Sequence, residues 1–427
     1  MKKLVGIITV LALFTSVASA ELLKNFKAEG SLEILSLTSD NQDFSKKSLT
    51  DDKYSETKAR VIVGATFDLN DDVDAKITAI KSDRYYGDTT ATNRDANSVL
   101  TNFVFEEAYI NLKGVLGMDH RLGRQEYGTP GDLVIYYGPA GWYVEGLGAG
   151  VRLDGWTATY KKDKLTVGAV SAKTFEAAAS NASMIDTDLY GITAAYDLGY
   201  EYLNPSFYFY QEDDGTPGVG NHVKGNVLGV KANGKFMGFN YGAEYAMNSG
   251  GDNANAGTGT DEEYAGTLMA LNADYDLDAE FGKFNFMGRY VMGSGDKNIT
   301  DKKDKEFHDI NANFRPGLIL GGSGVSGALG TVTSPSNLTV MILGANFTPN
   351  KWDGKLNLDA KMYNTKYTEA TNDGIGSELD LVASWMHSDD VCLKLAYAMF
   401  NPDQDYAGVG AKTDASTLMN FYVNVKF

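Results

Sequence analysis

Three features of this 427-residue sequence predict an all-β fold, namely a transmembrane, antiparallel, up-and-down β-barrel of 18 strands. Apolar and polar residues alternate along most of the chain, which is the period of strands that have one apolar face. Short and long polar connections alternate from one end of the chain to the other. Glycine, tyrosine and phenylalanine occur 47, 25 and 20 times, whereas only 8 prolines are present to interrupt strand ladders.

Composition excludes several other classes of protein. The chain has 38 basic and 56 acidic residues, and a net charge of -18 argues against a nucleic-acid partner. A single cysteine, Cys392, excludes a disulfide framework and multi-cysteine metal sites. After the N-terminal segment no apolar stretch of about 18 residues occurs, so membrane-spanning helices are not expected.

The N-terminus has the order of a secretory signal peptide. Two lysines, a short apolar stretch and the small residues Ala18-Ser19-Ala20 follow one another within residues 1–20. We expect cleavage after Ala20, which leaves residues 21–427 as a single outer-membrane barrel domain. The alternative is an uncleaved N-terminal anchor.

The C-terminus indicates the compartment. Apolar and polar residues alternate from Thr417 to the final residue, Phe427. A last strand that ends on phenylalanine resembles the terminal strand of bacterial outer-membrane barrels. The resemblance implies that Phe427 is an assembly signal, with the barrel-assembly machinery, periplasmic chaperones, outer-membrane lipid and lipopolysaccharide as partners. A soluble β-sandwich is the alternative for such a strand.

The polar face of the strands carries many charges. Lys58 and Arg60, for example, alternate with the apolar Ala59, Val61 and Val63. Such charges would be costly in a packed sandwich core but suit a water-filled lumen inside an apolar wall. Predicted inward charges sum to about +1, so the acidic excess lies at the mouths; pairing of these charges across strands is the alternative to a role in an anion path. The predicted pore-lining residues are Lys58, Arg60, Lys76, Glu107, Tyr109, Arg121, Arg124, Arg152, Asp154, Glu244, Arg289, Lys361 and Lys394.

The connections determine the strand count and the orientation. Eight short links, such as 70–72, 233–235 and 388–390, alternate with nine long links, such as 127–146 and 294–337, which requires 18 strands. Short turns are expected on the periplasmic side and long loops outside, with both termini in the periplasm. Residues 306–312 could form a further strand, but one more strand would make the number odd, so we assign them to a long external loop.

Two of the long loops are unusually apolar. Loops of this kind would be costly in water, and a very long connection in a compact protein is typically functional. We predict that loops 127–146 and 294–337 fold into the lumen and narrow it; packing over the mouth or against a partner is the alternative. The predicted constriction residues are Tyr136, Tyr137, Trp142, Tyr143, Phe314 and Arg315.

Residues 106–113, 121–128 and 151–156 carry a family resemblance. The segments Glu-Glu-Ala-Tyr-Ile-Asn-Leu-Lys, Arg-Leu-Gly-Arg-Gln-Glu-Tyr-Gly and Val-Arg-Leu-Asp-Gly-Trp resemble the alginate-export family of 18-stranded outer-membrane channels. The resemblance implies diffusion through a lumen whose arginines select anionic sugars or other small acids, with Arg121, Arg124 and Arg152 at the matching positions. Simple alternation places Arg124 on the lipid face, so an inward role for Arg124 requires a bulge or the end of the strand.

These features favour a porin over an enzyme. The four histidines lie in separate segments, and no catalytic, metal-binding or cofactor-binding constellation is expected. The predicted function is passive diffusion of ions and small hydrophilic solutes, including anionic sugars or organic acids. The alternative is a plugged structural or adhesive surface barrel whose loops bind an external partner.

Overall fold

The computed structural model describes residues 24–45, 52–85, 103–142, 151–176, 186–215, 222–253, 261–298, 300–323, 331–407 and 412–427. The predicted signal peptide, residues 1–20, and the predicted constriction residue Tyr143 lie outside these ranges. None of the described helices is long and apolar enough to cross a membrane.

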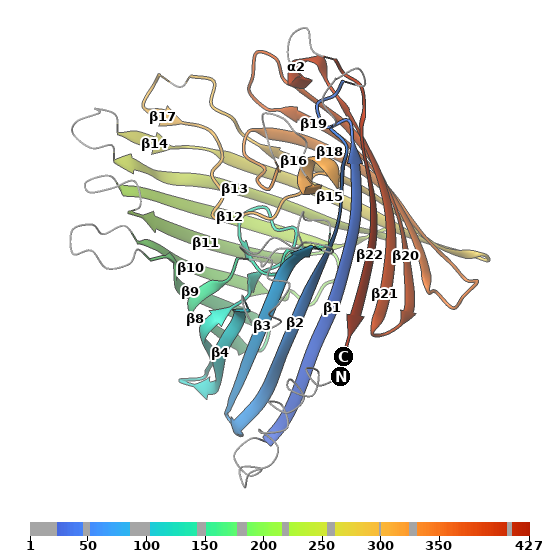
Figure 1. The fold of residues 1–427 in the computed structure, drawn as a ribbon. Helices are drawn as coiled ribbons and strands as arrows, with labels where there is room; N and C mark the ends of the chain where they lie inside the picture. Colours follow the sequence, from blue (N-terminus) through green and yellow to red (C-terminus); the bar gives the residue numbers. More distant parts are fainter. Residues whose placement is uncertain are drawn as a thin grey trace.

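Within the described residues, 18 antiparallel strands form a closed ring in chain order, as predicted (Figure 1). The ring closes where β1 pairs with β22, and Gly30 and Phe427 exchange two backbone hydrogen bonds of 2.8 and 3.0 Å at this seam. The barrel strands are β1 (Lys24–Asp40), β2 (Tyr54–Asn70), β3 (Val73–Tyr85), β4 (Val104–Val115), β5 (Met118–Gln125), β8 (Leu153–Lys162), β9 (Leu165–Phe175), β10 (Thr187–Tyr196), β11 (Asn204–Asp214), β12 (His222–Phe236), β13 (Phe239–Asn253), β15 (Thr267–Ala279), β16 (Gly282–Gly293), β18 (Leu338–Pro349), β19 (Leu356–Tyr367), β20 (Gly374–Ser388), β21 (Val391–Pro402) and β22 (Ser416–Lys426).

Short elements decorate the long connections. β6 (Tyr127–Gly128) and β7 (Tyr136–Tyr137) form a small hairpin, and β14 (Glu262–Tyr264) and β17 (Lys303–Asp304) extend the sheet beyond β13. The π-helix η2 (Ile319–Ser323) and the helix α2 (Gln404–Ala407) complete the set in the described ranges. Residues 306–312 add no barrel strand, which confirms their assignment to a loop; their one bridge joins Asn311 to Ile135.

Short and long connections gather at opposite ends of the barrel, here called the short-turn end and the long-loop end. One short turn differs from expectation. The sequence pattern places the β12–β13 turn at residues 233–235, but β12 continues to Phe236, and the turn is formed by Met237 and Gly238. Both turn residues have positive φ angles, 50° and 86°, as a two-residue hairpin turn requires.

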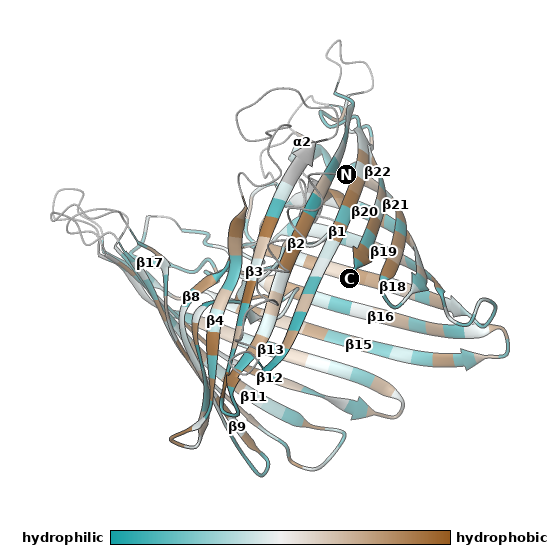
Figure 2. Cartoon of the chain, turned by 60° about the horizontal axis from the view of Figure 1, so that its bottom comes forward, coloured by the Kyte–Doolittle hydropathy of each residue, from teal (hydrophilic) through white to brown (hydrophobic). Residues whose placement is uncertain are grey.

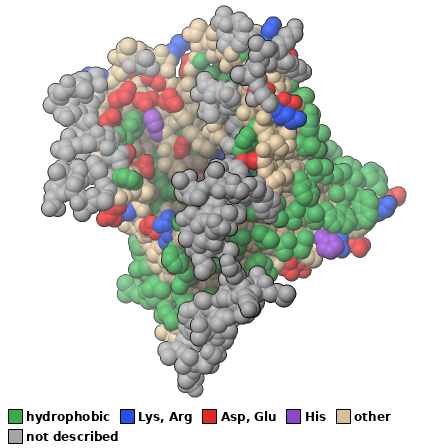
Figure 3. Space-filling model, in the orientation of Figure 1, with side chains coloured by type: hydrophobic (Ala, Val, Ile, Leu, Met, Phe, Trp, Pro, Cys, Tyr) green, Lys and Arg blue, Asp and Glu red, His purple; other side chains and the backbone are tan. Residues whose placement is uncertain are grey.

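The outer face of the barrel is apolar. Outward positions such as Ile77, Ile192, Leu271 and Leu381 are exposed, and Figure 2 shows the resulting alternation of hydrophobic and hydrophilic positions along the strands. In Figure 3 hydrophobic side chains cover the surface over β20–β22, and acidic side chains gather at the long-loop end near β14 and β17. Because no water in a bilayer core would hydrate backbone groups, a closed barrel with this surface suits a membrane.

The hydrophobic core lies inside the barrel, in its long-loop half. Loop residues Leu133, Phe307 and Ile319 are almost fully buried against inward wall residues such as Leu153 and Val340. Loops 127–146 and 294–337 therefore fold into the lumen in their described parts, and their apolar side chains are removed from water.

Candidate functional site: a constriction in the lumen

The first inward loop is held to the wall by Asp132. One carboxylate oxygen of Asp132 accepts hydrogen bonds from the N–H groups of Val134 (2.9 Å) and Ile135 (3.1 Å). The other oxygen lies 2.8 Å from Nζ of Lys231 on β12, which is also 3.4 Å from Glu244 on β13. A side chain of the loop thus orders its own turn and anchors the turn to the sheet.

The described parts of the two inward loops, residues 126–142, 294–298, 300–323 and 331–337, bond to each other, and we call them together the crossing loops. The N–H of Tyr136 donates to the carbonyl of Asn311 (2.8 Å), and the Asn311 side chain donates to the carbonyl of Tyr136 (2.7 Å). The N–H of Asn313 donates to the carbonyl of Asp132 (2.9 Å). The loops therefore form one connected unit inside the lumen.

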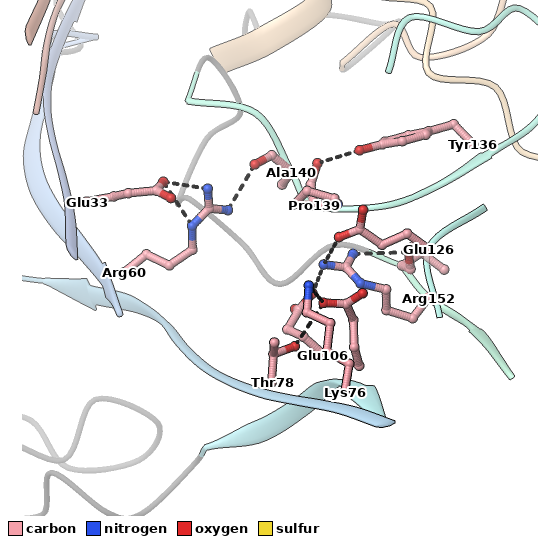
Figure 4. Close-up of polar contacts among 12 residues, drawn as sticks. Glu33, Arg60, Lys76, Thr78, Glu106, Glu126, Tyr136, Pro139, Ala140 and Arg152 are labelled. Atoms are coloured by element: carbon pink, nitrogen blue, oxygen red, sulfur yellow. Dashed lines mark hydrogen bonds and ion pairs between the residues drawn. The ribbon is translucent and has the colours of Figure 1, made fainter. Parts of the chain in front are cut away.

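A second wall contact lies on the opposite side of the first loop. Arg60 on β2 donates to the carbonyl of Ala140 (2.9 Å) while its Nε contacts Glu33 on β1 (3.1 Å; Figure 4). The first crossing loop is therefore tied to both β2 and β12.

A cavity of about 520 Å³ lies where the crossing loops meet the wall formed by β16–β21. Arg289, Lys361 and Lys394 line it from the wall, together with the acidic Asp359 and Asp380, and Trp142, Phe314 and Arg315 line it from the loops. The Arg289 guanidinium carbon lies 5.9 Å from the Phe314 ring centre, and Lys394 Nζ lies 4.9 Å from that of Trp142. Residues predicted separately as wall and loop positions thus meet at one place.

The cations of this cavity differ in their partners. Lys361 pairs with Asp359 (2.7 Å). Among the described residues, no carboxylate lies within ion-pair distance of Arg289 or Lys394, and their charge is met by aromatic faces instead. The cavity therefore presents positive charge that the protein does not neutralise by ion pairing.

The basic residues of the N-terminal wall are paired with acids. Lys58 lies 2.5 Å from Glu56, Arg60 pairs with Glu33, and Lys76 lies 2.8 Å from Glu107 and 3.2 Å from Glu29. This pairing is the alternative that the sequence left open for these inward charges.

Arg152 belongs to the same paired group. It precedes β8 and is buried in an ion pair with Glu106, with Glu126 at 3.5 Å (Figure 4). Burial raises the pKa of the Glu126 carboxyl, and the positive charge of Arg152 opposes that increase.

A β-bulge brings Glu106 into this group. Thr78 on β3 faces Glu107, but Ala79 faces Phe105, so Glu106 is an extra residue on β4. Glu106 and Glu107 are both buried. Strict alternation places only one of two successive residues inward, and for this reason the sequence pattern missed Glu106 as a wall residue.

Arg121 and Tyr109 lie on the inward face, as predicted. The Arg121 guanidinium lies 4.1 Å from the centre of the Tyr109 ring, and its Nε donates to Asn111 (2.9 Å). Arg121 also lines a second cavity, of about 500 Å³, with Gln125 and Thr157. These residues therefore face the lumen.

The structure corrects the prediction for Arg124 and Asp154, which lie on the outer face. Gln125 and Thr157 bond to each other on the lumen side (2.8 Å), and Leu153 is fully buried there, so the alternate positions point outward. Arg124 and Asp154 face each other across β5 and β8 as an ion pair of 2.9 Å. The prediction was wrong for Asp154 because β8 begins only at Leu153, and Arg152, before the strand, does not share its alternation.

Tyr136 and Tyr137 are buried in the packing of the first crossing loop. The Tyr136 hydroxyl donates to the carbonyl of Pro139 (3.2 Å). These two residues therefore support the loop, whereas Trp142, Phe314 and Arg315 line the cavity. No group of three His, Cys, Asp or Glu side chains suited to a metal ion occurs in the described ranges.

Comparison with known proteins gives matches in structure alone. No protein-family model matches the chain, and no curated protein matches its sequence. OccK11 (OpdR) of Pseudomonas aeruginosa is 11% identical with a TM-score of 0.58, and covers 95% of this chain and 97% of its own. The P. aeruginosa outer membrane protein OpdK, solved with vanillate, is 10% identical with a TM-score of 0.56, covering 94% and 98%.

A BenF-like porin from Pseudomonas fluorescens gives a third match, with 10% identity, a TM-score of 0.55, and coverage of 95% and 99%. These similarities support the 18-stranded barrel fold over nearly the whole chain. None of the three is described as an alginate exporter.

Proposed function

We propose that this chain is an outer-membrane porin through which small hydrophilic solutes diffuse passively, with a preference for small anions at its constriction. The observation that carries the proposal is the cavity beneath the crossing loops, where Arg289 and Lys394 have no acidic partner among the described residues. Unneutralised cations in a narrow lumen concentrate anions and lower the barrier to their passage.

The barrel surface and the matched folds support the location. The apolar outer face suits lipid, and two of the matched structures are described as an outer membrane protein and a porin. We place the short-turn end in the periplasm and the long-loop end outside, next to lipopolysaccharide. Cleavage after Ala20 and reading of Phe427 by the barrel-assembly machinery, with periplasmic chaperones, remain parts of the proposal.

The solute class follows from the cavity. Vanillate, present in the OpdK structure, is a small aromatic carboxylate, and here Arg289 and Lys394, with the rings of Phe314 and Trp142, are among the residues that line a cavity of about 520 Å³. We propose organic acids of this size as solutes. The resemblance of residues 106–156 to the alginate-export family adds anionic sugars as a second class.

Single-channel recording in planar bilayers, with a KCl gradient and added vanillate, tests the proposal. We expect stable open steps, a reversal potential on the anion side, and a concentration-dependent reduction of the chloride current by vanillate. A cation-selective channel that vanillate does not affect would contradict the proposed preference.

A plugged surface barrel is the second candidate, because an apolar core packs inside the long-loop half of the lumen in its described part. The same recordings separate the two functions. Absence of conductance from protein with the heat-modifiable gel mobility of a folded barrel would favour the plug.

A further inference from the structure

We propose that Glu378 and Asp380, on β20, are positioning residues that hold the second crossing loop in the lumen and so fix Phe314 and Arg315 at the constriction. The alternation of buried and less buried residues along β20 places both side chains on its inward face. The inference rests on the proposed function for its effect on permeation, but the contact between loop and wall is independent of it.

The two carboxylates accept three successive backbone N–H groups of the loop. Glu378 accepts from Ile319 (2.6 Å) and Leu320 (3.0 Å), one on each oxygen, and Asp380 accepts from Leu318 (3.1 Å). Successive N–H groups that converge in this way form an anion-binding concavity. Here the anion is supplied by the barrel wall.

Because the carboxyl groups and the loop N–H groups are buried, each would be costly without the hydrogen bonds between them. Glu378 and Asp380 are only 2% and 4% exposed, and no basic side chain of the described residues lies within ion-pair distance of them. A buried carboxylate without a cation is costly unless hydrogen bonds satisfy it. The loop N–H groups provide those hydrogen bonds, so displacement of the loop would leave both the carboxyl groups and the loop amides without their present partners.

The loop is shaped to approach the carboxylates closely. Gly317 has a φ of +95°, and a Cβ atom there would lie 2.4 Å from the carboxyl carbon of Glu378. Only glycine therefore fits at this position without displacing the loop or the carboxylate.

The same segment carries the constriction residues. Arg315 donates from Nη1 to the carbonyl of Gly321 (2.7 Å), which closes the turn around residues held by Glu378. Phe314 lies next in sequence and contacts Arg289 across the cavity. Loss of the carboxylate contact would therefore release both residues from their present positions.

Cysteine accessibility tests the proposal directly. In a Cys392→Ala background, Ile319→Cys places a thiol at a position whose native side chain is 1% exposed. Glu378→Gln replaces one acceptor by a donor that faces a loop N–H. We expect it to increase the rate of modification by a charged methanethiosulfonate about tenfold or more, because hydrogen bonds to a charged acceptor are strong.

Two further variants make the result decisive. Gly317→Ala disturbs the contact from the loop side and leaves every strand residue unchanged, so it serves even where Glu378→Gln impairs barrel assembly. Asp359→Asn is the matched control, since it removes an inward carboxylate on the neighbouring strand β19 that pairs with Lys361. We expect Gly317→Ala to increase the modification rate and Asp359→Asn to leave it unchanged.

Unchanged modification rates in both Glu378→Gln and Gly317→Ala would overturn the proposal, and so would an equal increase in Asp359→Asn. Bilayer recordings of the same variants should show larger and noisier openings for the first two. Increased accessibility in a protein that never conducts would retain the positioning role and remove the porin function. Unchanged accessibility in variants of a channel that conducts would remove the positioning role of Glu378 and Asp380 and retain the porin function.

Discussion

The wall formed by β1–β4 and the wall formed by β16–β21 both carry inward basic residues, but only the first neutralises nearly all of them. Lys58, Arg60 and Lys76 each lie within ion-pair distance of a glutamate. Across the lumen, Arg289 and Lys394 face aromatic rings. The total charge of a channel wall is therefore a poor guide to selectivity, because ion pairing decides where a permeating solute meets an unbalanced field.

The largest expected effect is on ion selectivity at the unpaired wall. The double variant Arg289→Gln/Lys394→Gln should shift the anion-to-cation permeability ratio towards cations by about tenfold. The reason is that two positive charges without an ion-pair partner attract anions to the path and repel cations from it. Reversal potentials in a KCl gradient measure this ratio.

The control for this double variant removes a cation of the paired wall together with its acidic partner. Lys113 lies 2.9 Å from Asp74, so Asp74→Asn/Lys113→Gln leaves the local charge unchanged. We expect little change in reversal potential. Equal shifts in the two double variants would show that pairing does not distinguish the walls.

A smaller effect is expected on stability at the paired wall. Glu33→Gln leaves Arg60 buried without its carboxylate, which should lower the free energy of unfolding by about 3–5 kcal/mol. Asp359→Asn, which frees the more exposed Lys361, should cost only about 0–1 kcal/mol. Urea unfolding in lipid vesicles compares the two, and equal losses would contradict the difference in burial.

The smallest effect concerns pH at the junction of the crossing loops. Burial raises the pKa of Asp309 above its ordinary value of 3.8, although the N–H of Ala312 donates to it (2.6 Å). The native loop therefore binds more protons than the released loop as pH rises above 3.8, and local stability should fall with increasing pH through that window.

Hydrogen exchange measures this pH dependence. After correction for intrinsic rates, amides of residues 310–313 should be protected more strongly at pH 5 than at pH 8. Asp309→Asn should remove the difference. If the pH dependence of protection persisted in that variant, a titratable group other than Asp309 would be responsible for it.

Sequence periodicity predicted the barrel because the alternation of apolar and polar residues within each strand shows which face meets lipid. Arg289 and Lys394 could be placed inward in this way. The pairing of Asn311 with Tyr136 could not, because hydrogen bonds between distant loops leave no local pattern. The bulge at Glu106 and the late start of β8 each change the alternation by one residue, and for this reason Glu106 was missed and Asp154 was placed on the wrong face.

The seam between β1 and β22 has a consequence for folding. Gly30 and Phe427 lie near opposite ends of the described residues, and a side chain at Gly30 would collide with the Phe427 ring, at 2.5 Å from its nearest atom. All other neighbouring strands of the barrel are much closer in sequence, so this pairing has by far the highest contact order and the largest loop-closure entropy. Closure of the seam is therefore expected to be the last and slowest step of assembly, and Gly30→Ala should delay it while leaving the earlier hairpins unaffected.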